Sequence, residues 1–278
     1  MNQTTEQTRH ALFNTTAPRY QQRIMPAFGP LADSLVNLAT LCPSERVIDL
    51  GTGIGAAAFP AGETAHSVVG MDYAPAMFPI AQQIIQDTQS KCVTFYQGDM
   101  TTLPHPAHSF QVALASFGFN GIDPVKVFPE IYRILEAGGR LVFQEWGTVE
   151  AASKCVKQAV KQHKVAEADG FLAELRQLGQ TPKPWDTFGD VGPLIDLLQD
   201  IGFNPIQISL EKESIPLTPQ TFFHYKTAWA PYQAELNAMT AETRAEVEAE
   251  VMAHLSPWVG PDGRFLWEPE LLRVVARK

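Results

Sequence analysis

The sequence predicts an α/β protein with a mostly parallel β-sheet that is covered by helices on both faces. Short apolar stretches of strand length alternate along the chain with longer segments of helical periodicity, which is typical of a parallel sheet. The first strand, at 46–50, runs into the stretch Val-Ile-Asp-Leu-Gly-Thr-Gly-Ile-Gly over 47–55. Because glycines allow a tight turn and the close approach of a ligand, we expect a binding loop after this strand.

The elements around this strand can be assigned in order. A helix over 20–41 is expected to pack beside the sheet, since Leu31, Leu35 and Leu38 recur at helical spacing. A short helix follows the glycine loop, and Pro60 makes it irregular because proline removes a backbone hydrogen bond. The next expected elements are a strand at 67–71, a helix at 75–87, strands at 92–96 and 110–116, a helix at 128–137 and a strand at 140–146.

Glycines and a proline mark the ends of the later elements. Gly138–Gly139 predicts a left-handed stop for the helix that precedes it. Pro193 opens and Gly202 closes another helix, which carries an apolar stripe. Two final strands are expected at 206–210 and 271–276.

No linker divides the 278 residues, so we expect a single domain with a core and a cap. The segments outside the strand and helix alternation are mostly helical and follow the fifth and sixth strands. Loops at these positions reach the ligand edge of an open parallel sheet, so the cap is expected to cover that edge. The core is expected at about 42–147, 191–211 and 268–278, and the cap at about 1–41, 148–190 and 212–267.

The composition argues against several classes of function. A net charge of −9 and a pI near 5.3 argue against nucleic acid as a partner, because surfaces that bind it are basic. No apolar run approaches the roughly 20 residues of a membrane span, and the polar start does not fit a secretory signal, so a cytoplasmic protein is expected. The three cysteines lack paired spacing, which predicts reduced thiols. Among the seven histidines only His105 and His108 have the spacing of metal ligands, and this pair around a proline is expected in an exposed loop, so we expect no metal. The sequence is compatible with a homodimer.

The glycine loop alone allows two classes of cofactor. Gly51, Gly53 and Ala56 satisfy the dinucleotide fingerprint, and Asp72 lies at the spacing expected for an acid that binds ribose. A nicotinamide-dependent oxidoreductase is therefore one alternative. It does not explain the turn Gly98-Asp99-Met100.

An ordered set of motifs favours the other class. The spacing Asp-x-Gly-x-Gly-x-Gly begins at Asp49, and acidic turns follow at Asp72 and at Gly98-Asp99-Met100. Arg-Ile-Leu-Glu-Ala-Gly-Gly then occupies 133–139. Over about 45–147 this set resembles the class I S-adenosylmethionine (SAM) dependent methyltransferases, and within them the ubiquinone/menaquinone-type branch. The resemblance implies a Rossmann-like seven-stranded sheet whose final strand is antiparallel.

The resemblance also implies a cofactor site. Asp49 and the loop of Gly51 to Gly55 would hold the methionine part of SAM. Asp72 would bind the ribose, because its two oxygens can accept hydrogen bonds from both hydroxyls, and Asp99 with Met100 would border the adenine. The expected cofactor contacts are Asp49, Gly51, Thr52, Gly53, Gly55, Asp72, Tyr73, Met77, Asp99, Met100, Ser116 and Phe117.

The activity implied is transfer of a methyl group from SAM to a small, apolar or aromatic metabolite, with oxygen favoured over carbon or nitrogen as the accepting atom. Such a transfer is an in-line displacement, in which alignment and the exclusion of water can be most of the mechanism. Where a proton must leave, His224, Glu145 and Tyr20 are the candidate bases, although each is more often a packed, hydrogen-bonded residue.

Two further expectations concern the parts outside the resemblance. The cap is expected to choose the acceptor, with Phe223 and His224 contributing to that choice. The sequence also allows a methyltransferase-like fold that keeps SAM or its product as a structural ligand, while the protein binds another molecule or catalyses a different reaction.

Overall fold

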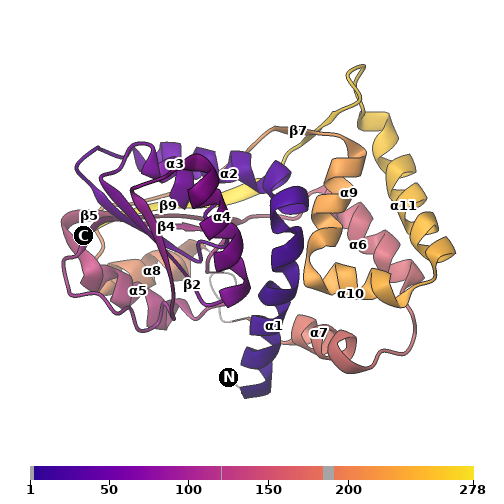
Figure 1. Ribbon diagram of the computed structural model, residues 1–278, viewed down its shortest axis with the longest axis horizontal. Coiled ribbons are helices and arrows are strands. Elements are labelled where there is room, and N and C mark those ends of the chain that lie inside the picture. Colours follow the sequence, from indigo (N-terminus) through magenta and orange to yellow (C-terminus); the bar gives the residue numbers. More distant parts are fainter. Residues whose placement is uncertain (1–2, 120, 184–190) are drawn as a thin grey trace. The chain divides into compact units, whose positions relative to one another are not determined.

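The computed structural model describes residues 3–119, 121–183 and 191–278, and residues 184–190 of the expected cap fall outside this part (Figure 1). The chain forms two compact units. The helical unit comprises Met1–Phe28, Thr148–Thr181 and Lys212–Glu270. The sheet unit comprises Gly29–Gly147, Pro182–Glu211 and Leu271–Lys278.

The sheet unit contains a seven-stranded sheet in the order β3-β2-β1-β4-β5-β9-β6. Its strands are β1 (Arg46–Leu50), β2 (Ser67–Asp72), β3 (Val93–Gln97), β4 (Phe110–Ser116), β5 (Leu135–Trp146), β6 (Ile206–Lys212) and β9 (Glu270–Arg277). The neighbours from β3 to β5 pair in parallel, whereas β9 runs antiparallel to β5. The predicted Rossmann-like sheet with an antiparallel final strand is confirmed.

Both faces of the sheet are covered by helices, as predicted. Along β4, Ala113 and Ala115 face a core that includes residues of α5 (Pro124–Ile134) and α8 (Val191–Ile201). The alternate residues Val112 and Leu114 face a second core, shared with α2 (Met25–Ala39) and α3 (Ala58–Gly62). This alternation follows from the two-residue repeat of a strand. A short 3-10 turn over Pro75–Met77 leads into α4 (Phe78–Thr88), close to the range predicted.

Helix α5 begins and ends earlier than the predicted range of 128–137. Asp123 caps the helix by accepting a hydrogen bond from the Val125 N–H at 3.2 Å, and Pro124 occupies the first turn, where a missing N–H has no cost. The helix ends at Ile134 because the next residue, Leu135, already pairs with Phe110 of β4.

The prediction that Gly138–Gly139 stops this helix was therefore wrong. Both glycines lie inside β5. Leu135 and Arg140 of β5 are five positions apart, yet they pair with residues of β4 that are only two positions apart, so the register of the two strands shifts here. Gly138 has φ +80 and lies at this irregularity. A glycine in a strand often marks such a bulge, since it adopts the left-handed conformation without strain.

The glycine stop predicted for α8 is confirmed. Gly202 has φ +115, and the N–H of Phe203 donates to the carbonyl of Leu198 at 3.0 Å. This bond closes the last turn of the helix in the manner of a Schellman motif.

The N-terminal helix starts well before the predicted residue 20. Helix α1 spans Gln3–Arg19 and continues through a π-helical turn over Tyr20–Ile24 into α2. Polar contacts within the helical unit hold it: the Ala230 N–H donates to Thr16 Oγ1 at 3.2 Å, and Arg19 Nε donates to the Ala228 carbonyl at 3.0 Å. The absence of a strong apolar stripe in α1 explains why the sequence did not predict it.

The rest of the helical unit is mostly helical, as expected. It contains α6 (Ala151–His163), α7 (Gly170–Gln180), α9 (Pro219–Ala228), α10 (Ala230–Ala238) and α11 (Ala241–Leu255). An antiparallel pair of short strands, β7 (Ile215–Leu217) and β8 (Phe265–Trp267), was not predicted. In the part of the chain that the structure describes, no helix has both the length and the apolar character needed to cross a membrane.

Candidate functional site

The glycine loop after β1 turns back onto β2. Gly51, Gly53 and Gly55 all have positive φ values, of +71, +55 and +95, which a residue with a Cβ rarely adopts. The backbone N–H groups of Gly51 and Thr52 both donate to the carbonyl of Met71, at 2.8 and 3.0 Å. The loop is therefore fixed at the carboxyl ends of two neighbouring strands.

A second turn, after β4, closes against this loop. A Cβ on Gly51 would lie 2.7 Å from Cα of Gly118, and a Cβ on Gly118 would lie 2.3 Å from the carbonyl oxygen of Leu50. The strand order places β1 and β4 on either side of the point where the order reverses, which is where open α/β sheets bind ligands. Gly118 was not among the predicted site residues, although its position between Phe117 and Phe119, directly after a strand, could have indicated a close approach of backbone.

Asp49 is buried beneath the loop, with 1% of its surface exposed. It accepts hydrogen bonds from Thr52 Oγ1 at 2.6 Å and from the backbone of Ala58. Burial raises the pKa of Asp49 to about 7, and the nearby Asp72 carboxylate adds to the increase. This carboxyl group can thus change its charge near neutral pH, and a bound cation would favour its charged form.

Asp72 joins β2 to the glycine loop. Its Oδ2 accepts a hydrogen bond from the Gly53 N–H at 2.8 Å, and its Oδ1 accepts one from the Ala74 N–H at 2.9 Å. Backbone N–H groups from two different turns thus converge on one carboxylate. The residue that sequence analysis assigns to a ribose therefore also orders the loop.

Asp99 follows β3 at the same edge of the sheet. It is exposed, and its Oδ1 accepts hydrogen bonds from the N–H and the Oγ1 of Thr101, each at 2.8 Å. Met100 and Met77 are buried, with 4% and 1% of their surfaces exposed, whereas Tyr73 is half-buried. The predicted cofactor residues from Asp49 to Met100 thus all belong to the sheet unit.

The other two predicted cofactor residues, Ser116 and Phe117, lie at the end of β4. Gln144 Nε2 donates to Ser116 Oγ at 3.0 Å and to the Leu31 carbonyl at 2.9 Å. Phe117 has φ +60, and its ring stacks on that of Trp146 with 4.1 Å between the centroids and 19° between the planes. The stack gives the carboxyl ends of β4 and β5 a flat, apolar group.

The candidate bases belong to different units. Glu145, in the sheet unit, is buried, and its Oε1 accepts a hydrogen bond from the Phe119 N–H at 2.9 Å. Tyr20, in the helical unit, is buried and packs edge-on against Trp229. His224 is half-buried in the same unit and is 3.0 Å from Gln220 Nε2. These contacts assign none of the three to proton transfer.

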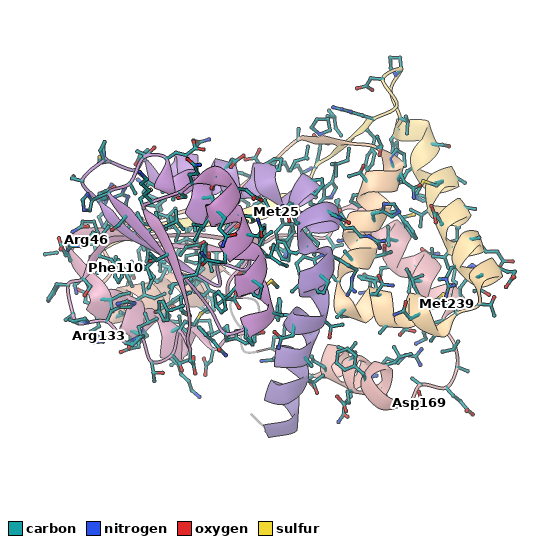
Figure 2. The ribbon with its side chains drawn as sticks, viewed as in Figure 1. Met25, Arg46, Phe110, Arg133, Asp169 and Met239 are labelled. Carbon is teal, nitrogen blue, oxygen red and sulfur yellow. The ribbon has the colours of Figure 1, made fainter. Side chains whose placement is uncertain are left out.

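Arg133 begins the motif at 133–139, and its side chain is labelled in Figure 2. Its guanidinium donates to the carbonyls of His105 and Leu103, at 2.7 and 3.0 Å, and pairs with Glu130. The motif thus fixes the loop before β4. Among the described residues, no group of three or more His, Cys, Asp or Glu side chains is placed to hold a metal ion.

The sequence of the chain is similar to those of known methyltransferases. The family model described as a methyltransferase domain matches residues 48–143. A demethylmenaquinone methyltransferase of Thermus thermophilus is 37% identical over 145 residues, which are 49% of this chain and 64% of that protein. A ubiquinone/menaquinone biosynthesis C-methyltransferase, UbiE, of Geobacter sp. is 30% identical over 156 residues, which are 50% of this chain and 63% of that protein. The chain therefore spans a little under two thirds of the length of both relatives.

A solved structure shows the same fold. The phosphoethanolamine N-methyltransferase 2 of Haemonchus contortus, in complex with SAM, has a TM-score of 0.59 at 15% identity, over 97% of this chain and 57% of that chain. The matched part of the chain, residues 48–143, is a class I SAM-dependent methyltransferase domain. Its sequence is similar to those of the ubiquinone/menaquinone-type methyltransferases.

Proposed function

We propose that this chain is a SAM-dependent methyltransferase whose acceptor is a small, apolar or aromatic metabolite. The observation that carries the proposal is the pair of buried carboxylates, Asp49 and Asp72, which both bond the glycine loop: Asp49 accepts from the Thr52 hydroxyl and Asp72 from the Gly53 N–H. When bound, SAM supplies a methyl group on a positively charged sulfonium. A loop with two carboxylates beneath it suits a cation.

Of the two carboxylates, Asp49 argues against a dinucleotide, whereas Asp72 would suit the ribose of either cofactor. The pyrophosphate of NAD would meet the glycine loop above Asp49, and the nearby negative charges would repel each other. For SAM, Asp49 and the loop would hold the methionine part, whose amino group is a cation. Asp72 would bind the ribose hydroxyls, and Asp99 would lie at the adenine.

We propose that the protein accelerates methyl transfer mainly by aligning the acceptor with the methyl group of SAM. The reaction is an in-line displacement, so holding the acceptor against the methyl group and excluding water accounts for most of the acceleration. The stacked rings of Phe117 and Trp146 support an apolar acceptor, because they place flat carbon surface where β4 and β5 end. The bond of Glu145 to the Phe119 N–H supports a positioning role for this carboxylate in the turn after β4.

We further propose that the helical unit chooses the acceptor, because it lies outside the matched residues 48–143. The element that accepts the methyl group, oxygen or carbon, is a separate question. The sequence favours oxygen, whereas the relative named as a C-methyltransferase favours carbon. Product analysis separates the two, since an O-methyl group and a C-methyl group differ in chemical shift and in resistance to hydrolysis.

The proposal is tested by incubating the protein with SAM that carries a trideuterated methyl group and with a metabolite extract. We expect mass spectrometry to find a new product that contains the labelled methyl group, and NMR of that product gives the accepting atom. The Asp72→Ala variant should yield little of it. Binding of SAM without any labelled product, across broad panels of acceptors, would favour the alternative in which SAM is a structural ligand.

A further inference from the structure

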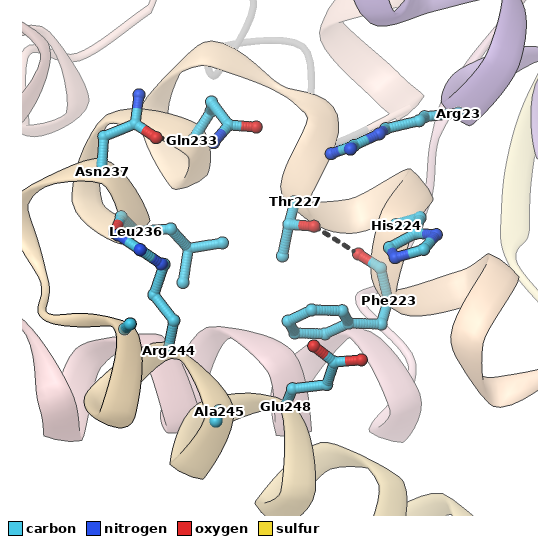
Figure 3. A pocket seen from close by; sticks show the side chains of 11 residues that line it. Arg23, Phe223, His224, Thr227, Gln233, Leu236, Asn237, Arg244, Ala245 and Glu248 are labelled. Atoms are coloured by element: carbon cyan, nitrogen blue, oxygen red, sulfur yellow. Dashed lines mark hydrogen bonds between the residues drawn. The ribbon is translucent and has the colours of Figure 1, made fainter.

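The helical unit contains a cavity of about 350 Å³ between α9, α10 and α11 (Figure 3). This volume lies in the range of sites for small molecules. Every residue that lines the cavity belongs to the helical unit, so its geometry is defined within that unit. The lining is mostly polar, but Phe223 and Leu236 contribute apolar surface.

Two arginines give the cavity a positive charge. Arg23 and Arg244 reach toward it from opposite sides (Figure 3), and neither forms an ion pair with any residue that the structure describes. Arg244 Nη1 donates to the carbonyls of Leu236 and Met239, at 3.3 and 2.9 Å, which fixes this guanidinium in place. Glu242, which does not line the cavity, interacts with Arg244 electrostatically without forming an ion pair with it. Arg23 makes no hydrogen bond to a described residue, so no residue in that part of the chain occupies its donors.

Glu248 is the one acid among the lining residues, and it is already engaged. Gln220 Nε2 donates to Glu248 Oε1 at 2.6 Å and also lies 3.0 Å from His224 Nε2. Because the amide nitrogen is a donor, His224 Nε2 must accept, and a neutral His224 then carries its proton on Nδ1. With His224 neutral, the residues that line the cavity carry two arginines and one carboxylate, which gives the lining a net charge of +1.

We propose that this cavity binds the carboxylate of a small amphipathic acid. The carboxylate is recognised by the guanidinium of Arg23, with the Nδ1–H of His224 as a second donor, because planar guanidinium groups bind carboxylates with paired hydrogen bonds. Phe223 and Leu236 contact the apolar body of the ligand. The net charge of +1 matches a monoanion better than a dianionic phosphate, which would face the Glu248 carboxylate. The inference goes beyond the proposed methyl transfer, and its test requires no SAM.

Calorimetric titration with 2-naphthoate, its neutral counterpart 2-naphthamide and 2-naphthyl phosphate tests the site. We expect 2-naphthoate to bind the wild-type protein at least about tenfold more tightly than either of the other two, as hydrogen bonds to a charged partner predict. The Arg23→Met variant should lose about tenfold in affinity for 2-naphthoate and should leave the weak binding of 2-naphthamide unchanged. Thermal unfolding shows whether each variant keeps its fold.

Arg264→Met is the matched control, since it removes the same charge from an exposed residue of the helical unit that does not line the cavity. Its affinity for 2-naphthoate should stay within about twofold of the wild type, because the interaction of exposed charges is screened by salt. Equal binding of acid and amide, an unchanged affinity in folded Arg23→Met, or no binding of 2-naphthoate at all would overturn the proposal. Tighter binding of the naphthyl phosphate would overturn its assignment to carboxylates.

Discussion

Asp72 accepts a hydrogen bond from the backbone N–H of Gly53 at 2.8 Å, across 19 positions of sequence. The second oxygen of the same carboxylate accepts from the Ala74 N–H, so one side chain holds the turns that follow both β1 and β2. The conformation of the glycine loop and the proposed recognition of the ribose therefore depend on the same group. Any change at Asp72 should affect both.

Replacing Asp72 with alanine should weaken the binding of SAM by about 1–3 kcal/mol, because hydroxyl groups of the ligand and N–H groups of the loop lose a charged acceptor. Asp72→Asn should fall between this variant and the wild type, since one amide oxygen can still accept. Calorimetry gives the affinities, and circular dichroism checks that the fold survives. Wild-type affinity in folded Asp72→Ala would show that the ribose assignment is wrong.

Asp49 should make stability depend on pH. Its folded pKa, about 7, is raised above an unfolded value of about 3.9, so the folded state holds a proton that the unfolded state releases. The stabilisation from protonated Asp49 is therefore complete below about pH 4 and is lost as the pH rises toward and through 7. The free energy of unfolding of Asp49→Asn minus that of the wild type should therefore rise from about pH 4 to about pH 7 and then level off.

Urea unfolding of both proteins between pH 4 and pH 8, at roughly unit steps, measures this difference directly. The prediction concerns the difference between the two proteins, because other acids change the stability of both alike. A constant difference across the range would mean that the pKa of Asp49 is not raised in the folded protein.

Gly51→Ala should destabilise the protein more than Gly138→Ala. Both glycines have positive φ, which costs a residue with a Cβ roughly 1 kcal/mol. Only at Gly51 would the new Cβ also collide with backbone, at 2.7 Å from Gly118 Cα, whereas nothing lies within 4 Å at Gly138. We expect a further loss of about 1–3 kcal/mol for Gly51→Ala in chemical denaturation, as overpacking predicts. Equal losses would refute the close approach of the two turns.

Phe223→Leu and His224→Asn should change the turnover of the acceptor much more than the affinity for SAM, because we assign acceptor choice to the helical unit. Single-turnover rates with a saturating acceptor, set beside calorimetric affinities for SAM, separate the two effects. Parallel losses of SAM binding and turnover in folded variants would place this segment at the cofactor instead.

The strands of the sheet could be predicted because each is a short apolar run between turn residues. β1 lies where expected, and the ends of β2 and β3 differ by one residue. The start of β5 could not be predicted, since Leu135 continues the apolar pattern of α5 and only its pairing with Phe110 makes it part of a strand. The β7–β8 pair could not be predicted either, because three-residue strands far apart in sequence gain their stability from tertiary pairing.

Motif spacing predicts where the cofactor site lies, but it does not predict the contacts of the residues in those motifs. Asp49 and Asp72 stand in recognisable motifs, yet the raised pKa of Asp49 depends on burial that spacing does not reveal. The bond between Glu145 and the Phe119 N–H joins residues 26 positions apart and needs the folded sheet. A sequence can mark where charged groups occur, whereas their partners depend on the packing of distant segments.

Calorimetric titration of the protein with SAM and, separately, with NADH shows which of the two cofactors the glycine loop binds. We expect binding of SAM that Asp72→Ala weakens, and no measurable binding of NADH under the same conditions. Tight binding of NADH together with no binding of SAM would contradict this expectation.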